Sequence, residues 1–249
     1  MRIAVVIPVY NEERTLPELM RRIGATPPPT LPGGGACERR VLLCDDGSLD
    51  GTGTLIEEYA LRPEVLAVPS RVNTGKGGAI RRGFDAALRD GADVILVQDA
   101  DLEYDPADHA AVLRPILEGR ADAVIGSRFL RVGGPVRRFW HAQANRGLTL
   151  LSNVFSDLRL TDMECGTKAF TRAVLERMDL RERGFGIEPE MVAKLAKVRL
   201  PGEGGRPPRR VRAWEVGVSY EPRGYDEGKK IGWRDGLRAV YCIVKYNLF

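Results

Sequence analysis

The amino-acid sequence predicts a single α/β domain with a mostly parallel central sheet that is flanked by helices. Two observations predict this class. Short apolar runs of strand length alternate with amphipathic helical patterns, which is the order of successive βα units. In addition, no low-complexity linker divides the 249 residues, and a chain of this length can bury a sizeable core as one domain.

The first βα unit opens the chain. An apolar run from Ile3 to Val9 predicts a strand that ends in the polar loop after Tyr10. A helical stripe follows, formed by Leu16, Leu19, Met20 and Ile23.

The second unit has a strand-like run at residues 41–44, the loop DDGSLDGT, and an apolar helical stripe at Leu55, Ile56 and Tyr59. Two interpretations of Asp45 and Asp46 stay open. They are ligand-binding carboxylates at a strand end, or they form a helix N-cap pair together with Ser48 and Asp50.

A glycine-rich segment, NTGKGGAIRRG, leads into the third predicted helix. Its glycines do not have the spacing of a nucleotide-triphosphate loop or of a dinucleotide fingerprint. The glycines either let the helix pack closely against the sheet, or they accompany Lys76 in a contact to a bound phosphate or sugar.

Acidic side chains follow the next strand, in the segment DVILVQDADLEYD. If the backbone stays extended, Asp99, Asp101 and Glu103 point to one face and converge. Hard oxygen ligands select Mg²⁺ or Mn²⁺, and Mg²⁺ is usually held by one or two carboxylates plus substrate phosphates. The alternative is a solvated acidic turn. Ligands of open parallel sheets bind outside the carboxyl ends of the strands, so these loops predict one shared site.

The net charge of +4 is unevenly distributed, because residues 128–146 contain five arginines and no acidic residue. Arginine suits bidentate phosphate binding, so this stretch is either an anion-binding segment or a solvated basic loop. No aromatic series or nucleic-acid motif accompanies the charge, and we expect no nucleic-acid partner.

The four cysteines are widely spaced, which favours neither a zinc site nor a disulfide framework and indicates a reducing cytoplasm. We expect no signal peptide and no bilayer-spanning segment. Residues 236–249 predict an amphipathic C-terminal helix that docks on the core or on a bilayer. Together with residues 147–160 and the arginine stretch, this helix would form a membrane-facing edge.

Five ordered motifs, VIPVYNE, DDGSLDGT, NTGKGGAIRRG, DADLEYDP and GSRF, resemble those of family 2 glycosyltransferases, and most closely those of dolichol- or polyprenyl-phosphate mannose synthases. The resemblance implies a Rossmann-like GT-A fold and sugar transfer with inversion. It implies a divalent metal on Asp101, Asp99 and Glu103. It also implies that the Asp46 carboxylate accepts a hydrogen bond from the edge of the base in UDP or GDP. The side chains expected around base and ribose are Pro8, Tyr10, Asn11 and Glu12.

For the acceptor, the resemblance implies a polyprenyl or dolichyl phosphate. Arg128 and Arg131 would hold this phosphate. The segment PRGYDEGKK departs from the more usual R-x-x-G-x-S-K pattern by Glu227, and its basic residues would close over the phosphates: Arg223, Lys229 and Lys230.

Two alternatives stay open. A hydroxyl acceptor would need a general base. Glu190 is the candidate for this role, although Glu190 and Glu188 also suit the cap of the predicted helix that contains them. The second alternative is a nucleotide-sugar-binding subunit without turnover.

The expected division of the chain is a nucleotide-sugar-binding part at 1–130, an acceptor-binding part at 131–235 and the C-terminal helix at 236–249. We expect the protein in the cytoplasm, at the cytoplasmic face of a membrane. Asp101, Arg128 and Glu190 are the candidate catalytic residues.

Overall fold

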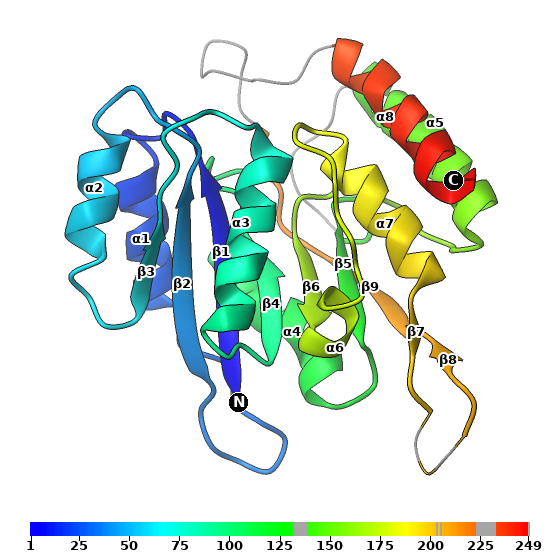
Figure 1. Ribbon diagram of the computed structural model, residues 1–249, viewed down its shortest axis with the longest axis horizontal. Coiled ribbons are helices and arrows are strands. Elements are labelled where there is room, and N and C mark those ends of the chain that lie inside the picture. Colours follow the sequence, from blue (N-terminus) through cyan, green and yellow to red (C-terminus); the bar gives the residue numbers. More distant parts are fainter. Residues whose placement is uncertain (132–138, 203, 205, 223–232, 249) are drawn as a thin grey trace.

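The structure is a computed structural model that describes residues 1–131, 139–202, 204, 206–222 and 233–248. A central sheet of seven strands runs through the molecule, in the order β3-β2-β1-β4-β6-β5-β9, and helices cover it (Figure 1). The strands of this sheet are β1 (Arg2–Val9), β2 (Glu38–Asp45), β3 (Val65–Val68), β4 (Val94–Val97), β5 (Ala123–Ser127), β6 (Lys168–Thr171) and β9 (Ala213–Gly217). The expected single α/β domain with a mostly parallel sheet is confirmed.

The helices are α1 (Leu16–Ala25), α2 (Thr52–Tyr59), α3 (Lys76–Arg89), α4 (His109–Leu117), α5 (Phe139–Ser156), α6 (Arg172–Leu175), α7 (Ile187–Lys197) and α8 (Trp233–Leu248), with a 3₁₀ turn η1 (Pro106–Asp108) before α4. Strands β7 (Arg199–Leu200) and β8 (Arg209–Arg210) form a separate two-stranded sheet. None of the described helices is both long and apolar enough to cross a membrane.

Strand β1 lies at the centre of the site-bearing half of the sheet. Val5 pairs in parallel with Val41 of β2 on one side and with Leu96 of β4 on the other. The chain moves outward from β1 to β3 and then returns through α3 to β4, so the strand order reverses between β1 and β4. In such sheets the reversal opens a crevice at the carboxyl ends of the strands, which is the upper edge of the sheet in Figure 1.

Strand β6 is the exception to the parallel order. It lies antiparallel between β4 and β5, with Leu96 opposite Ala169 and Val124 opposite Ala169 on the other side. Because β6 runs the opposite way, the loop that precedes it, residues 162–167, comes to the same edge as the loop that follows β4. This insertion brings a late segment of the chain to the predicted site.

Each face of the sheet has its own core. Helices α1, α2 and α4 bury their apolar stripes on one face, whereas α3 and α7 bury theirs on the other. Gly83 of α3 fits closely against the sheet, because a Cβ at this position would clash with the side chains of Val6 and Cys44. The interpretation that glycines allow close packing of this helix is therefore confirmed at Gly83.

The C-terminal helix begins at Trp233, three residues before the expected boundary, and docks on the core. Its buried side chains are Ala239, Cys242, Ile243 and Tyr246. Of the stretch at 147–160, residues 147–156 lie in the longer helix α5, which ends at Ser156 and packs against α8.

Candidate active site

The acidic residues after β4 lie in a turn and not in extended backbone. The strand ends at Val97, and Leu102 has a positive φ of 63°. A positive φ is unusual for a large side chain and tends to occur at functional sites. The expectation that Asp99, Asp101 and Glu103 converge through strand alternation was therefore wrong; the turn sets their positions.

A chain of buried charges begins at Asp99. Its Oδ1 lies 2.8 Å from Nζ of Lys76, the first residue of α3, and the same Nζ lies 3.0 Å from Oε1 of Glu188. The other Glu188 oxygen lies 2.7 Å from Nζ of Lys168, which is fully buried. Burial acts to lower the pKa of Lys76, but the carboxylates of Asp99 and Glu188 raise it well above the usual value. Lys76 is thus a charged bridge between α3, the β4 loop and α7.

Asp101 lies in a concentration of negative charge. Its Oδ1 accepts a hydrogen bond of 3.1 Å from the backbone N–H of Glu103. Burial, followed by the charges of Asp99 and Glu103, raises the pKa of Asp101 to about 7. A cation at this position would favour the ionised form and relieve the repulsion.

The loops after β1 and β2 hold each other. Asn11 has a positive φ of 53°. Its side-chain oxygen accepts a hydrogen bond of 2.8 Å from the Leu49 N–H, and its backbone N–H donates to Ser48 Oγ. Glu12 is buried, and its backbone N–H donates to Thr52 Oγ1 at 2.9 Å. Pro8 is the penultimate residue of β1, next to these loops, and Tyr10 is half-buried beside Asn11. Their contact with base and ribose stays a prediction.

Asp46 anchors the glycine-rich loop. Its buried carboxylate accepts from Thr74 Oγ1 at 2.7 Å, from the Gly75 N–H at 2.6 Å and from Arg82 Nη2 at 2.8 Å. These bonds fix the loop that leads into Lys76. Asp46 does not cap α2, which begins at Thr52, so the N-cap interpretation was wrong for this residue. Base recognition by Asp46 stays a prediction, and the hydrogen bonds add a structural role.

Arg128 is held in a bidentate pair with Asp162. Nε and Nη2 of Arg128 each lie 2.7 Å from an oxygen of the fully buried Asp162, and Asn145 Nδ2 donates to the same carboxylate. The Arg128 guanidinium also lies over the ring of Tyr220, 5.1 Å from its centroid. Arg131 is half-exposed, 3.4 Å from Asp108.

The basic residues Arg223, Lys229 and Lys230 lie outside the described part of the chain, as do Arg137 and Arg138. Their roles stay predictions.

The two glutamates of α7 differ in what they contact. Glu188 belongs to the charge chain that begins at Asp99, as described above. Glu190 is fully buried, and it accepts from the backbone N–H groups of Arg181 and Glu182 at 2.7 Å each and pairs with Lys194 at 2.6 Å. Glu190 thereby holds the loop at 181–182, and this geometry does not support its use as a base.

Comparison with known proteins places these motifs in one family. The sequence profile of "Glycosyl transferase family 2" matches residues 4–179, which include both acidic loops, the glycine-rich segment and Asp162. The chain belongs to glycosyl transferase family 2. The resemblance that the five motifs carry is thereby confirmed.

Three relatives of this glycosyltransferase have a lipid phosphate in their names. The polyprenol monophosphomannose synthase of Mycolicibacterium smegmatis is 36% identical over 72% of this chain and 65% of that protein. The undecaprenyl-phosphate mannosyltransferase of Micrococcus luteus is 30% identical over 100% of this chain and 95% of that protein. The dolichol-phosphate mannosyltransferase of Pyrococcus furiosus is 30% identical over 78% of this chain and 53% of that protein. The matched part of this chain thus spans about half to two thirds of the first and third relatives.

A solved structure supports the GT-A fold. Glucosyl-3-phosphoglycerate synthase from Mycobacterium tuberculosis, in complex with Mn²⁺, UDP and phosphoglyceric acid, matches with a TM-score of 0.67. The match covers 99% of this glycosyltransferase and 78% of that chain at 20% sequence identity, so it shows the fold alone.

The carboxylates of the acidic turn can bind a divalent cation, provided that the diphosphate of the sugar donor supplies further ligands. No group of three His, Cys, Asp or Glu side chains in the described residues is arranged to bind a metal on its own. Mg²⁺ needs only one or two carboxylates when phosphates complete its shell. Asp101 and Glu103 supply hard oxygens, whereas Asp99 is paired with Lys76. The expected metal role of Asp99 therefore requires its release from Lys76.

Sequence reasoning missed the loop DMECGTK, residues 162–168, which completes the site of the glycosyltransferase. A Cβ at Gly166 would clash with the Asp99 carboxylate, so any larger residue here would have to displace Asp99. Lys168 Nζ also donates to the carbonyls of Met163 and Cys165. Burial and the charge of Glu188 raise the pKa of Glu164 to about 7, and its Oε1 is buried without a hydrogen bond. The signal in the sequence was a lysine at the start of the strand-like run KAFT.

Proposed function

We propose that the chain transfers a hexose, with inversion, from a UDP- or GDP-sugar to a polyprenyl or dolichyl phosphate at the cytoplasmic face of a membrane. The observation that carries this proposal is the meeting of the acidic turn at Asp101 with the pair of Arg128 and the buried Asp162 at one sheet edge. The relatives named after lipid phosphates support the acceptor class.

The donor half of the proposal rests on residues 1–130. Asp101 and Glu103, with Asp99 once it leaves Lys76, would hold Mg²⁺ or Mn²⁺ on the diphosphate, and the ion would stabilise the negative charge of the leaving group. Asp46 fixes the glycine-rich loop and so sets the position of Lys76. Lys76 then faces the diphosphate with a charge that its carboxylate neighbours keep in place.

The acceptor half rests on residues 131–235, together with Arg128. A phosphate anion is already a nucleophile and needs no base, so the chain has only to bind and orient it. Asp162 positions the guanidinium of Arg128 beside the crevice, and Arg131 adds a second cation. Glu188 and Glu190 are both paired with lysines, which agrees with a reaction that uses neither as a base.

The nucleotide-binding role of Asp46 gives a first prediction. Asp46→Ala should weaken binding of the nucleoside diphosphate by about 1.5 to 3 kcal/mol, the range for a hydrogen bond to a charged group. Titration calorimetry with UDP and with GDP measures this loss. The melting temperature separates the two roles: a loop anchor also lowers it when removed, whereas a group that only contacts the base does not. Unchanged affinity for both nucleotides would place base recognition elsewhere.

One observation favours a second function, transfer to a hydroxyl group. Burial raises the pKa of the Glu164 carboxyl to about 7, which is near the operating pH of a general base, and no hydrogen bond occupies its Oε1. It lies two residues from Gly166, which contacts Asp99. In this alternative Glu164, and no longer Glu190, is the better-placed base.

The acceptor class is tested by three variants at saturating donor. For a lipid phosphate, Arg131→Ala should raise the KM for the acceptor and leave donor binding intact, while Glu164→Gln and Glu190→Gln keep near-normal turnover. For a hydroxyl acceptor, loss of the base should cost about 10² to 10⁴ in rate. Negligible effects in all three variants would remove each of these assignments. A third outcome, nucleotide binding without turnover with any lipid or glycan acceptor, would indicate a non-catalytic subunit.

A further inference from the structure

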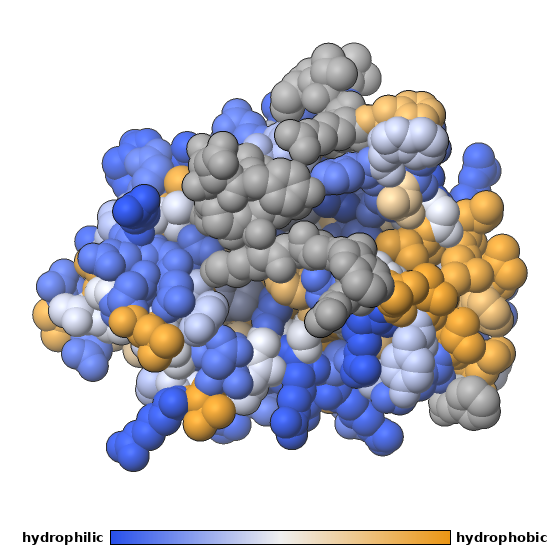
Figure 2. All heavy atoms as spheres, turned by 90° about the horizontal axis from the view of Figure 1, so that it is seen from above, coloured by the Kyte–Doolittle hydropathy of each residue, from blue (hydrophilic) through white to orange (hydrophobic). Residues whose placement is uncertain are grey.

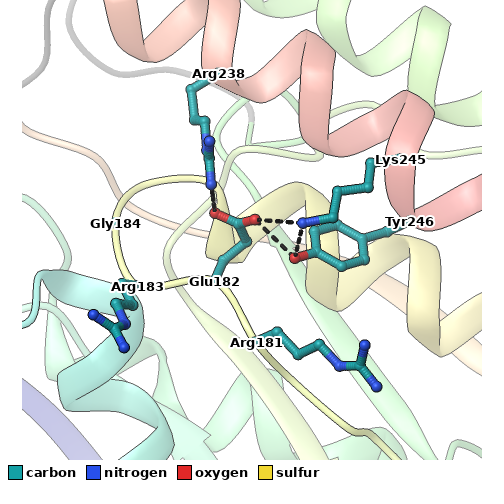
Figure 3. A pocket seen from close by; sticks show the side chains of 7 residues that line it. All are labelled: Arg181, Glu182, Arg183, Gly184, Arg238, Lys245 and Tyr246. Carbon is teal, nitrogen blue, oxygen red and sulfur yellow. Dashed lines mark hydrogen bonds and ion pairs between the residues drawn. The ribbon is translucent and has the colours of Figure 1, made fainter.

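A pocket separate from the acidic turn lies between α8 and the loop that precedes α7 (Figure 3). Its volume is about 380 Å³. Its lining consists of Arg181, Glu182, Arg183, Gly184, Arg238, Lys245 and Tyr246. The Arg183 carbonyl accepts a hydrogen bond of 3.0 Å from the Gly78 N–H of α3. The loop is therefore bonded to the helix that begins at Lys76.

The pocket lining is strongly basic, with four cations and one carboxylate. The carboxylate of Glu182 is buried and already engaged: it accepts from Arg238 Nη2 and from the Tyr246 hydroxyl at 2.7 Å each. Arg181 pairs with Asp179, and both side chains are exposed to solvent. Among the described residues, no hydrogen bond or ion pair holds the guanidinium of Arg183. The charge therefore exceeds what the protein neutralises, and arginine forks match phosphate oxygens.

An exposed apolar face adjoins this pocket. Helices α5 and α8 pack side by side (Figure 1). Both present large apolar side chains to solvent, and hydrophobic residues gather at this end of the molecule (Figure 2). Trp140, Leu150 and Val154 of α5 are 78%, 65% and 72% exposed, and the large apolar residues that α8 exposes include Leu237, Val240, Tyr241 and Leu248. Arg238 and Lys245 lie over the ring of Tyr241, 5.0 and 5.4 Å from its centroid. Tyr241 thus joins the basic pocket to the apolar face.

We propose that the pocket binds the phosphate headgroup of an anionic membrane phospholipid while the α5–α8 face inserts among the acyl chains. Stable peripheral binding requires apolar insertion together with attraction to anionic lipid, and this edge supplies both side by side. A second copy of the chain fits less well, because a two-fold contact through this face would bring two sets of the same cations together. This phospholipid is not the polyprenyl phosphate acceptor, so the proposal rests on the proposed function only in its location at a membrane.

The test uses the full chain and two kinds of vesicle, phosphatidylcholine alone and an equimolar mixture with phosphatidylglycerol. Loss of one basic residue near an anionic surface weakens binding by roughly fivefold. The double variant Arg181→Glu/Arg183→Glu should therefore bind the mixed vesicles at least about tenfold more weakly, with unchanged residual binding to phosphatidylcholine. Arg114→Glu is the matched control, because Arg114 is exposed on α4, on the other face of the sheet, and should bind as the unaltered protein does.

A second variant tests the apolar face. Leu150→Asp/Val154→Asp changes two exposed side chains and should weaken binding to both kinds of vesicle, with an unchanged melting temperature. Wild-type vesicle binding in either double variant overturns the proposal. So does unchanged vesicle binding combined with a raised KM for detergent-solubilised polyprenyl phosphate, because the pocket would then serve the acceptor. Vesicle binding is measured without turnover, so the two proposals fail separately. If the chain transfers no sugar but still binds anionic vesicles through Arg181 and Arg183, only the proposed function is refuted.

Discussion

Asp101→Asn should lower the rate of sugar transfer by at least about two orders of magnitude, the scale for loss of one electrostatic stabiliser of a transition state. The substitution preserves the shape of the side chain but removes the charge that faces Glu103 in the turn after β4. Because burial and two neighbouring carboxylates raise the pKa of Asp101 to about 7, the unliganded protein should tolerate an amide here. The measurement is the rate of product formation from labelled donor with Mn²⁺, together with the melting temperature.

Asp105→Asn is the matched control for this variant. Asp105 lies four residues further along and its side chain caps η1 by accepting from the Ala107 N–H, a role that asparagine can also fill. The turnover of the Asp105→Asn variant should stay within about twofold of that of the unaltered protein. Normal turnover of Asp101→Asn, or full activity in the presence of a chelator, would remove the metal from the mechanism.

Lys168→Met should destabilise the fold by about 3 kcal/mol or more. Lys168 is fully buried, pairs with Glu188 and donates to two carbonyls of the loop before β6. Removal of one partner of a buried pair leaves an uncompensated charge, which typically costs about 3 to 5 kcal/mol. Urea unfolding measures the change as a shift in midpoint at constant slope.

Two further variants make this prediction specific. Lys197→Met changes an exposed lysine at the end of α7 and should alter stability by less than about 0.5 kcal/mol. In the double variant Lys168→Met/Glu188→Gln the unpaired charge is gone, so its loss of stability should be smaller than the sum of the two single losses. A cost below about 1 kcal/mol for Lys168→Met, or strict additivity, would mean that the pair does not couple the β6 loop to α7.

The strands of the first half of the fold could be predicted from the sequence because β1, β2 and β4 each contain a short, continuous apolar run. The expected strand from Ile3 to Val9 corresponds to Arg2–Val9, and the strand expected within the segment DVILVQDADLEYD is β4, Val94–Val97. Burial on both faces of a parallel sheet produces such runs. The meeting of polar loops at one edge followed from the same pattern, because parallel strands place their carboxyl ends together.

The non-local parts of the site could not be predicted in this way. Strand β6 has four residues, and nothing in the run KAFT shows that it inserts antiparallel between β4 and β5. Without that insertion, Gly166 has no reason to lie beside Asp99, and Lys168 has no reason to pair with Glu188. The difference between Glu188 and Glu190 depends on the rotation of α7 about its axis, which places two residues of the same type in different surroundings.

The backbone of the acidic turn was also beyond pattern reasoning. Strand alternation predicted that three carboxylates share one face, but the left-handed residue Leu102 ends the alternation between Asp101 and Glu103. The ion pair of Asp99 with Lys76 likewise joins residues that are far apart in the sequence, so only the folded chain reveals that Lys76 competes with a metal for this carboxylate.

The central claim, hexose transfer to a lipid phosphate, is tested most directly by the mass of the product. The full chain would be incubated with Mn²⁺, a panel of UDP- and GDP-hexoses, and purified polyprenyl phosphate. The account predicts a polyprenyl phosphate that is heavier by one hexose residue with at least one donor, and no such product with Asp101→Asn. Hexose found only on a hydroxyl acceptor, or no transfer from any donor that the protein binds, would contradict it.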